Sequence, residues 1–213
     1  MFQAVIFDLG GVVFDSPLAE FRRFEKERGL ADLTLGRIVM GSGPDGSWAR
    51  LERGELSLAE FCAAFEADAG AAGADISATE LMDRVARSMK VRPVMLGAVR
   101  RLRSHGLSTA ALTNNWKLGE AGDARMAELR REFDVFVESC RTGLRKPDPA
   151  IYELALRELS VRPEHAVFLD DLGHNLKPAR ALGMETIKVT DPEAALAELG
   201  ELVGLELLSS PAK

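Results

Sequence analysis

Polar residues that suit one kind of chemistry occur in four groups along this chain, each at or soon after the end of a short apolar run. The groups are Asp8-Leu9-Gly10-Gly11, Thr113-Asn114-Asn115, Arg145-Lys146-Pro147 and Asp170-Asp171, with Asn175 four positions further on. They supply three carboxylates, a hydroxyl group, side-chain amides and a lysine. A carboxylate can attack phosphorus directly and split one difficult displacement into two easier ones through an acyl-phosphate. These residue types indicate phosphoryl transfer.

Attack by a carboxylate on a phosphate requires that negative charge be neutralised. A hard cation in an oxygen-only site made by Asp8 and the Asp170-Asp171 pair would do this, and Mg²⁺ is the natural choice. Lys146 would add a further positive charge. Thr113 and the backbone N–H groups after it would donate hydrogen bonds to the phosphoryl oxygens. The Gly10-Gly11 pair would let the backbone approach the metal and the phosphate closely.

The elements that must position these groups follow an alternating pattern. Five short, continuously apolar runs are typical of buried parallel strands: Ala4–Phe7, Thr109–Leu112, Val135–Val137, Ala166–Leu169 and Thr186–Val189. Helical patterns lie among the later runs, at Val94–Ser104, around Ala124–Arg131, at Ala150–Leu159 and at Leu176–Leu182. This alternation predicts an α/β fold with a doubly wound parallel sheet. Ligands bind outside the carboxyl ends of such strands, where the four polar groups would meet.

The stretch that follows the first predicted strand has a different pattern. It contains no convincing strand and several amphipathic helical patterns, such as Leu18–Arg28 and Leu58–Ala69. Phenylalanines recur three or four positions apart on one helix face there, which is typical of a small apolar core. We therefore expect a helical unit of residues 17–92, inserted into a core domain made of residues 1–16 and 93–213.

Composition narrows the class of protein. The chain has 213 residues, with 27 Lys and Arg against 33 Asp and Glu and a formal net charge of −6. Nucleic acids and anionic membranes need a basic surface, so neither is expected as a partner. Cys62 and Cys140 lie far apart without a CxxC spacing, which favours two reduced thiols. Since no apolar run is long enough for a membrane span or a signal peptide, we expect a cytoplasmic protein.

The motifs resemble those of a known family. Val5–Val13 (VIFDLGGVV), Ala111–Asn115 (ALTNN), Arg145–Pro149 (RKPDP) and Phe168–Leu176 (FLDDLGHNL) resemble the four ordered motifs of haloacid-dehalogenase-like hydrolases. Four motifs in order are far more specific than any one alone. The resemblance covers nearly the whole chain and implies a Rossmann-like core with an inserted helical cap. It is strongest to the branch that holds the N-terminal phosphatase domain of soluble epoxide hydrolase and the related acyl-CoA dehydrogenase family domain.

The resemblance implies roles for the acidic residues. Asp8 would be the nucleophile and a metal ligand, and the backbone carbonyl of Gly10 would be another ligand. Asp171 would be the main metal ligand from the fourth motif, with Asp170 beside it. From its position alone, the Asp170-Asp171 pair would also cap the helix that follows.

The remaining motif residues are polar or basic. Thr113 and Asn114 would bind the phosphate, and Lys146 would neutralise both the phosphate and the nucleophile. Asn175 would support the acidic pair from behind.

One position departs from the family pattern. Phosphatases of this family usually carry a second aspartate two residues after the nucleophile, where it protonates the leaving oxygen. Gly10 stands there in this chain and cannot transfer a proton. General acid–base help is typically worth about 10²- to 10⁴-fold in rate, so turnover should favour leaving groups that need little protonation. His174, in the loop after the fourth strand, is an alternative proton donor.

The motifs together predict a magnesium-dependent phosphatase that hydrolyses a small phosphorylated metabolite through an aspartyl-phosphate on Asp8. One alternative is a haloacid-type dehalogenase, which would account for Gly10 but not for the adjacent acidic pair, because its carbon chemistry needs no cation. Another is a catalytically weak binding protein for a phosphorylated ligand. The retained nucleophile, lysine and acidic pair disfavour it. The natural substrate and the oligomeric state are left open.

Four other residues near the motifs or in the helical unit are weaker candidates. Asn115 and Trp116 directly follow the phosphate-binding pair. Arg53 would reach the substrate from the helical unit, whereas Trp48 is expected to pack inside that unit.

Overall fold

A parallel sheet of five strands forms the centre of the molecule. The computed structural model, which describes residues 1–208 apart from the side chains of residues 120 and 121, orders the strands β3-β2-β1-β4-β5. They are β1 (Ala4–Phe7), β2 (Ser108–Thr113), β3 (Val135–Glu138), β4 (Ala166–Asp170) and β5 (Glu185–Lys188). The chain moves outward from β1 to β3 and then returns to β4, so strand order reverses between β1 and β4. The predicted α/β fold is confirmed, and each predicted strand is correct to within one residue at each end.

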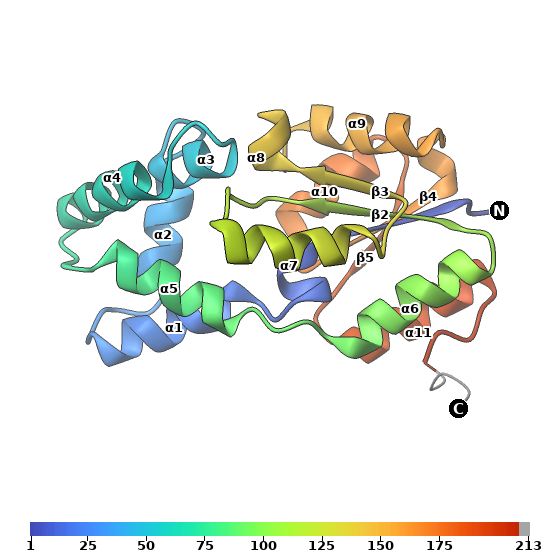
Figure 1. Cartoon of the computed structure of the whole chain (residues 1–213), viewed down its shortest axis with the longest axis horizontal. Helices are drawn as coiled ribbons and strands as arrows, with labels where there is room; N and C mark the ends of the chain where they lie inside the picture. Colours follow the sequence, from blue (N-terminus) through green and yellow to red (C-terminus); the bar gives the residue numbers. More distant parts are fainter. Residues whose placement is uncertain (209–213) are drawn as a thin grey trace.

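Side chains of β1 point alternately into two apolar layers. Val5 and Phe7 belong to the core on one face of the sheet, and Ala4 and Ile6 to the core on the other. Helices lie on both sides of the sheet (Figure 1): α6 (Pro93–Ser104), α7 (Glu120–Arg130), α8 (Ser139–Thr142), α9 (Pro149–Leu159), α10 (Gly173–Ala181) and α11 (Pro192–Val203). Because both faces of β1 are covered and all four of its residues are buried, its sequence is continuously apolar rather than alternating.

Five α-helices between β1 and α6 form a second group, called the helical unit below. They are α1 (Pro17–Glu27), α2 (Thr34–Gly41), α3 (Ser47–Glu52), α4 (Leu58–Ala71) and α5 (Ala78–Ser88). They lie beside the sheet (Figure 1) and enclose an apolar core of their own, which includes Phe21, Phe24, Phe61 and Phe65. The predicted helices Leu18–Arg28 and Leu58–Ala69 are therefore confirmed, and the phenylalanines pack as expected.

The two chain crossings between the sheet and the helical unit lie side by side. Phe14 and Val91 form an isolated antiparallel bridge, the Asp15 N–H donates to the Lys90 carbonyl (2.9 Å), and the Arg92 N–H donates to the Val13 carbonyl (2.8 Å). The Arg92 guanidinium also donates to the carbonyl of Gly11 (2.7 Å). These contacts tie both ends of the helical unit to the turn that follows the first strand.

Helix ends follow local sequence signals at some positions and not at others. α6 and α10 end just before Gly106 and Gly183, which have φ values of +83° and +99°, as the sequence predicts. α10, however, begins at Gly173, three residues before its predicted start at Leu176. Within residues 1–208, no helix combines the length and the apolar character needed to cross a bilayer.

Candidate active site

A buried lysine joins the ends of the two central strands. The Lys146 Nζ lies 2.8 Å from Asp8 Oδ1 and 2.7 Å from Asp170 Oδ2. Asp8 directly follows β1, and Asp170 is the last residue of the neighbouring strand β4, so the parallel pairing itself brings the two carboxylates together. Lys146 reaches them from the loop between α8 and α9 and is 1% exposed. The predicted nucleophile, lysine and first acidic residue of the pair therefore meet at the reversal of strand order.

The carboxylates around Lys146 outnumber the positive charge of the lysine. Burial raises the pKa of Asp8 well above its ordinary value, the Lys146 ammonium opposes that rise, and the Asp170 carboxylate adds to it. Burial alone would lower the pKa of Lys146, but the carboxylates of Asp170 and Asp8 outweigh it and leave the pKa raised. The lysine therefore stays protonated. Since Asp171 brings a third carboxylate, the protein alone leaves an excess of negative charge.

The geometry of the three carboxylates fits a cation. Asp8, Asp170 and Asp171 each place one oxygen within 4.8 Å of the oxygens of the other two. Burial and the Asp170 carboxylate raise the pKa of Asp171 to about 6. A hard divalent cation with oxygen ligands would relieve this repulsion.

The two aspartates of the pair are not equivalent. Both oxygens of Asp170 already accept hydrogen bonds: the carboxylate accepts from Lys146 Nζ, from the Leu172 N–H (2.8 Å) and from Asn175 Nδ2 (3.1 Å to each oxygen). Asp171 accepts only a long hydrogen bond from Ser16 Oγ (3.4 Å) among the contacts of the described residues. Asp171 is thus the member of the pair with oxygens to spare for a ligand. Ser16 has no motif around it and was not predicted.

The expectation that the pair caps the following helix is wrong. The cap residue of α10 is Leu172, and no side chain caps that helix. Asp170 instead accepts from the Leu172 N–H two residues on, within the turn, because its other bonds hold it under Lys146.

Behind the acidic pair lies a second layer of polar contacts. Asn175 is buried and donates to Asp170, as expected for a supporting residue. The Tyr152 hydroxyl donates to the Asn175 carbonyl (2.7 Å) from α9, and burial raises the pKa of Tyr152, so it remains a neutral donor. Tyr152 was not predicted, because one aromatic residue in an amphipathic helix is indistinguishable from ordinary core.

Thr113, Asn114 and Asn115, at the end of β2, have different contacts. Thr113 ends β2, next to β1, and is buried. The Asn114 side chain holds the lysine loop: its Oδ1 accepts from the Lys146 N–H (2.8 Å) and its Nδ2 donates to the Lys146 carbonyl (3.0 Å). Asn115 points elsewhere, since its Nδ2 donates to Glu138 (2.8 Å). Of the two predicted phosphate-binding residues, Asn114 thus has its side chain engaged with Lys146.

The helical unit supplies one residue that was not predicted. Glu52, at the end of α3, accepts from Asn114 Nδ2 (3.2 Å) and from Arg145 Nη2 (2.6 Å). Only the fold brings it near the motifs, because it lies 62 positions from Asn114 and 93 from Arg145. Arg53 turns away, donating to Glu55 and to the Pro44 carbonyl.

The structure also shows the surroundings of Trp48, Trp116 and His174. Trp48 packs in the core of the helical unit, as expected, and Trp116 lies against it with ring centroids 6.1 Å apart. His174 is half-buried, and burial lowers its pKa, so at neutral pH its ring is mainly uncharged.

The two glycines after Asp8 differ in what their positions require. Gly11 has a φ of +79°, and a Cβ there would lie 2.1 Å from Asp171 Oδ2. Gly10 has an ordinary φ of −68°, and a Cβ there would meet only Pro17 Cδ, at 3.7 Å. Close approach therefore demands glycine at position 11. At position 10 the backbone would accept any residue, including the aspartate usual in the family.

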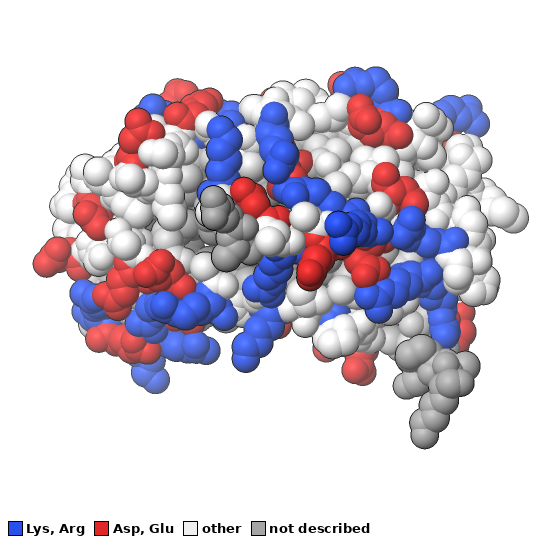
Figure 2. All heavy atoms as spheres, viewed as in Figure 1, with Lys and Arg blue, Asp and Glu red and all other residues white. Residues whose placement is uncertain are grey.

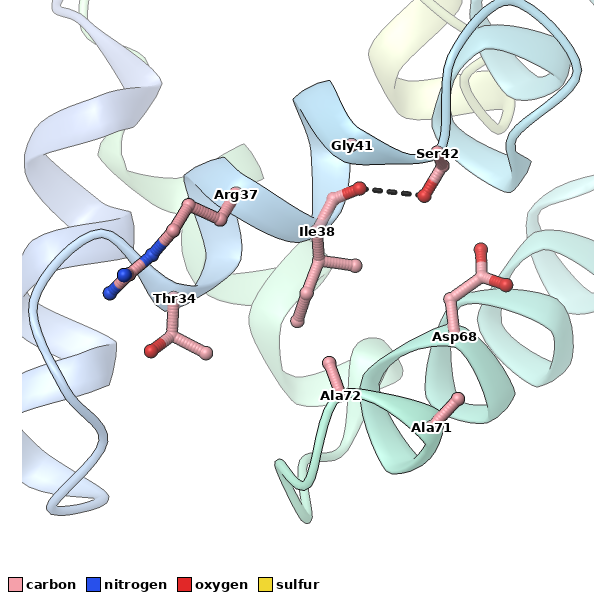
Figure 3. Close-up of a pocket in the computed structure, with 8 residues that line it drawn as sticks. All are labelled: Thr34, Arg37, Ile38, Gly41, Ser42, Asp68, Ala71 and Ala72. Carbon is pink, nitrogen blue, oxygen red and sulfur yellow. Dashed lines mark hydrogen bonds between the residues drawn. The ribbon is translucent and has the colours of Figure 1, made fainter.

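A cavity of about 620 Å³ lies elsewhere, between α2 and α4. Its lining includes Thr34, Arg37, Ser42 and Asp68, and most of the rest is small and apolar (Figure 3). None of its lining residues belongs to the carboxylate–lysine cluster, so the candidate chemistry does not take place there.

Known proteins are similar to this chain in sequence. Mouse (Mus musculus) acyl-CoA dehydrogenase family member 10 is 39% identical over 209 residues, which cover 97% of this chain and 20% of that protein. Pig (Sus scrofa) bifunctional epoxide hydrolase 2 is 38% identical over 223 residues, covering 99% of this chain and 40% of that protein. The chain thus spans about one fifth and two fifths of these relatives. Sesquiterpene phosphatase AstK of Aspergillus oryzae is 28% identical over 207 residues, which cover 95% of this chain and 97% of that protein.

Solved structures share the fold. A predicted HAD-like hydrolase from Porphyromonas gingivalis superposes with a TM-score of 0.69 at 21% identity, over 97% of this chain and 100% of its own. A HAD-family enzyme from Bacteroides thetaiotaomicron, crystallised with magnesium and inorganic phosphate, superposes with a TM-score of 0.61 at 18% identity, over 88% of this chain and 94% of its own. Residues 2–183 match the family of haloacid dehalogenase-like hydrolases, so the chain belongs to that family and is a hydrolase.

Proposed function

We propose that this chain is a magnesium-dependent phosphatase, which hydrolyses a small phosphorylated metabolite through an aspartyl-phosphate on Asp8. The observation that carries the proposal is the charge arrangement at the strand ends. One buried ammonium, that of Lys146, bridges Asp8 and Asp170, while Asp171 adds a third carboxylate. The similarity to a protein named as a phosphatase over almost its full length supports the same chemistry.

The donor set fits Mg²⁺. Asp8, Asp171 and the backbone carbonyl of Gly10 would hold the ion, with the saturated Asp170 contributing its charge from behind. When bound, Mg²⁺ would neutralise the phosphate and the carboxylate that attacks it.

The residues of the chain would divide the remaining work. Lys146 Nζ and the Leu9 N–H (2.6 Å) both bond to Asp8 Oδ1, which fixes the rotation of the carboxylate and keeps its other oxygen for the incoming groups. Attack forms an Asp8 O–P bond as the P–O bond to the leaving group breaks, and water then hydrolyses the acyl-phosphate to inorganic phosphate. Thr113 and backbone N–H groups after β2 would donate to the phosphoryl oxygens. Asn114 would serve chiefly by holding Lys146.

The leaving oxygen needs a proton that Gly10 cannot supply. His174 is one candidate and a solvent water is the other; the structure places His174 in the first turn of α10 rather than in the loop expected from the sequence. We therefore propose that the enzyme favours substrates whose leaving groups need little protonation.

We also propose that the helical unit acts as a cap, with domain boundaries at residues 16/17 and 92/93. Its separate apolar core and the adjacent chain crossings support this division. A cytoplasmic location stays a prediction from the sequence.

A magnesium-dependent assay with p-nitrophenyl phosphate tests the function. We expect hydrolysis with Mg²⁺, loss on chelation and recovery when Mg²⁺ is restored. Full activity after exhaustive chelation, or release of halide from a 2-haloacid, would favour the dehalogenase alternative. Tight binding of phosphorylated metabolites without turnover would favour the binding protein.

A further inference from the structure

One carboxylate of the helical unit collects hydrogen bonds from both parts of the molecule. Glu52 Oε1 accepts from Trp48 Nε1 (3.0 Å), inside the helical unit. Its Oε2 accepts from Asn114 Nδ2 (3.2 Å), on the loop after β2, and from Arg145 Nε and Nη2 (2.8 and 2.6 Å), on the loop between α8 and α9. The residue is 7% exposed. A buried carboxylate with this many donors is held in one place, because each oxygen would be costly to leave unpaired.

Two partners of Glu52, Asn114 and Arg145, are each connected to Lys146. The Asn114 amide that donates to Glu52 also donates to the Lys146 carbonyl, and its oxygen accepts from the Lys146 N–H. Arg145 is the residue before Lys146. Glu52 therefore holds the lysine backbone from two sides, and the lysine in turn bonds to Asp8 and Asp170.

The segment around Glu52 is pressed against the sheet domain. Gly54 has a φ of +71°, and a Cβ there would lie 2.3 Å from the Cys140 carbonyl oxygen of α8, so only glycine allows this approach. Trp48 and Trp116 meet edge to face across the same boundary. α3 and α8 face each other in Figure 1, and basic side chains gather over this boundary in Figure 2. The contact is distinct from the chain crossings at residues 13–17 and 89–92.

We infer that Glu52 is a positioning residue, which couples docking of the helical unit on the sheet domain to the placement of Lys146 between Asp8 and Asp170. The inference deepens the proposed function and rests on it for its effect on catalysis. When α3 leaves α8, Asn114 and Arg145 lose their common acceptor, and the lysine loop is released. The reactive geometry is thus complete only when the helical unit is docked.

Glu52→Gln is the sharpest variant. It keeps the shape of the side chain but replaces one acceptor oxygen by an NH₂ donor, which would face either the Trp48 N–H or the Asn114 and Arg145 donors. Glu55→Gln is the matched control, because Glu55 lies three positions away, has a side chain that is 45% exposed and pairs with Arg50 and Arg53 of its own helical unit. We expect Glu52→Gln to lower kcat for p-nitrophenyl phosphate by about tenfold or more, with KM changed by less than about threefold, and Glu55→Gln to change neither.

Two further measurements do not need turnover. Trp48 and Trp116 are the only tryptophans of the chain, so near-ultraviolet circular dichroism of the pair reports docking. Competitive acetylation followed by mass spectrometry reports the exposure of the Lys146 Nζ, with the exposed Lys188 as reference. We expect Glu52→Gln to weaken the tryptophan signal and to raise Lys146 acetylation by about tenfold, while Glu55→Gln matches wild type.

The outcomes separate the two proposals. Wild-type rates, tryptophan signal and Lys146 protection in Glu52→Gln would overturn the positioning role while leaving the phosphatase proposal intact. If wild type shows no phosphatase activity, but Glu52→Gln still loses the tryptophan signal and the protection of Lys146, the coupling is supported and the proposed function is overturned. If Glu52→Gln does not fold, Arg145→Met releases the same contact from the other side, and unchanged Lys146 acetylation in that variant would also overturn the inference.

Discussion

Two clusters of carboxylates in this molecule share their composition but not their electrostatics. In the helical unit, three glutamates meet three arginines: Glu20, which is buried, and the more exposed Glu27 and Glu80 pair with Arg23, Arg28 and Arg84. At the strand ends, three aspartates meet one buried lysine. The first cluster is balanced in charge and the second is not.

The pKa values respond in opposite directions. The Arg84 hydrogen bond lowers the pKa of Glu27, whereas burial raises the pKa of Asp8 and of Asp171. Ion pairs that serve structure satisfy their charges, while a site that must receive a cation and a phosphate keeps charge unsatisfied. The comparison distinguishes a charge-balanced ion-pair network from the proposed active site without reference to any relative.

The largest expected effect is from Asp8→Asn, which removes the proposed nucleophile. Phosphatase activity should fall by about a thousandfold or more, because no acyl-phosphate can form. Glu27→Gln, a carboxylate of the balanced cluster, should leave activity unchanged. Steady-state kinetics of both variants, with melting curves as a check of folding, measure the difference. Activity of Asp8→Asn within about tenfold of wild type would exclude Asp8 as nucleophile.

Gly11→Ala should come next. Its methyl group would collide with the Asp171 carboxylate, in a backbone conformation that disfavours alanine, so the proposed metal site would be displaced. We expect activity to fall by about a hundredfold and the Mg²⁺ concentration for half-maximal activity to rise. Gly10→Ala is the control, because its Cβ has room. Equal effects of the two alanines would contradict the geometry described here.

Gly10→Asp tests the missing proton donor. Wild type should hydrolyse p-nitrophenyl phosphate much faster than simple alkyl phosphates, and the aspartate should narrow this ratio by about tenfold or more. The backbone at Gly10 has an ordinary φ, so a narrowed ratio would not reflect a strained turn. If wild type shows no dependence on the leaving group, another residue supplies the proton, and His174→Gln becomes the variant to measure.

Asp171→Asn should stabilise the metal-free protein. The Asp171 pKa is raised to about 6 in the folded state, so the folded state binds more protons than the unfolded one, and stability falls as pH rises from about 4 to 6. Asparagine removes this penalty, which should add about 1 kcal/mol at pH 7 after solvent screening and flatten the decline. Urea unfolding of wild type and variant at pH 4.5 and pH 7 measures the difference in their free energies of unfolding. Added Mg²⁺ should stabilise wild type but not the variant. A less stable metal-free variant at pH 7 would contradict the charge imbalance.

The smallest effect is expected from Arg84→Met in the balanced cluster. Glu27 lies at the surface, and the buried Glu20 keeps its bond to Arg23 when Arg84 is removed, so the loss should lower the melting temperature by only about 2 to 4 °C. Activity should not change. Lowering the pH should weaken the contribution of this cluster to stability. The hydrogen bond from Arg84 lowers the pKa of Glu27 in the folded state, so its ion pair stabilises the fold at pH values above the ordinary pKa of a glutamate. This stabilisation is lost as the pH falls and the carboxylate is protonated. A loss of activity would tie this face of the helical unit to catalysis.

The predicted site residues that lie together in the structure share a local signature. Asp8, Lys146 and Asp170 meet because parallel strands end at one edge, and that arrangement follows from the apolar runs before them. Strand positions were predictable to within one residue, because burial on both faces makes the runs continuously apolar. The start of α10 was less predictable, because the bonds of Asp170 in the turn override ordinary capping.

Other features depended on contacts between distant residues, which no periodicity records. Glu52 and Tyr152 belong to none of the four motifs, and they make their contacts to the motif residues only when α3 and α9 pack on the sheet domain. The demand for glycine at position 11, but not at position 10, is decided by an Asp171 carboxylate 160 positions away. The sequence by itself determined the strands, the order of the motifs and the chemical groups at their ends. The tertiary structure decided which oxygen each donor meets, because hydrogen-bond geometry depends on distances of a few tenths of an ångström between elements far apart in the chain.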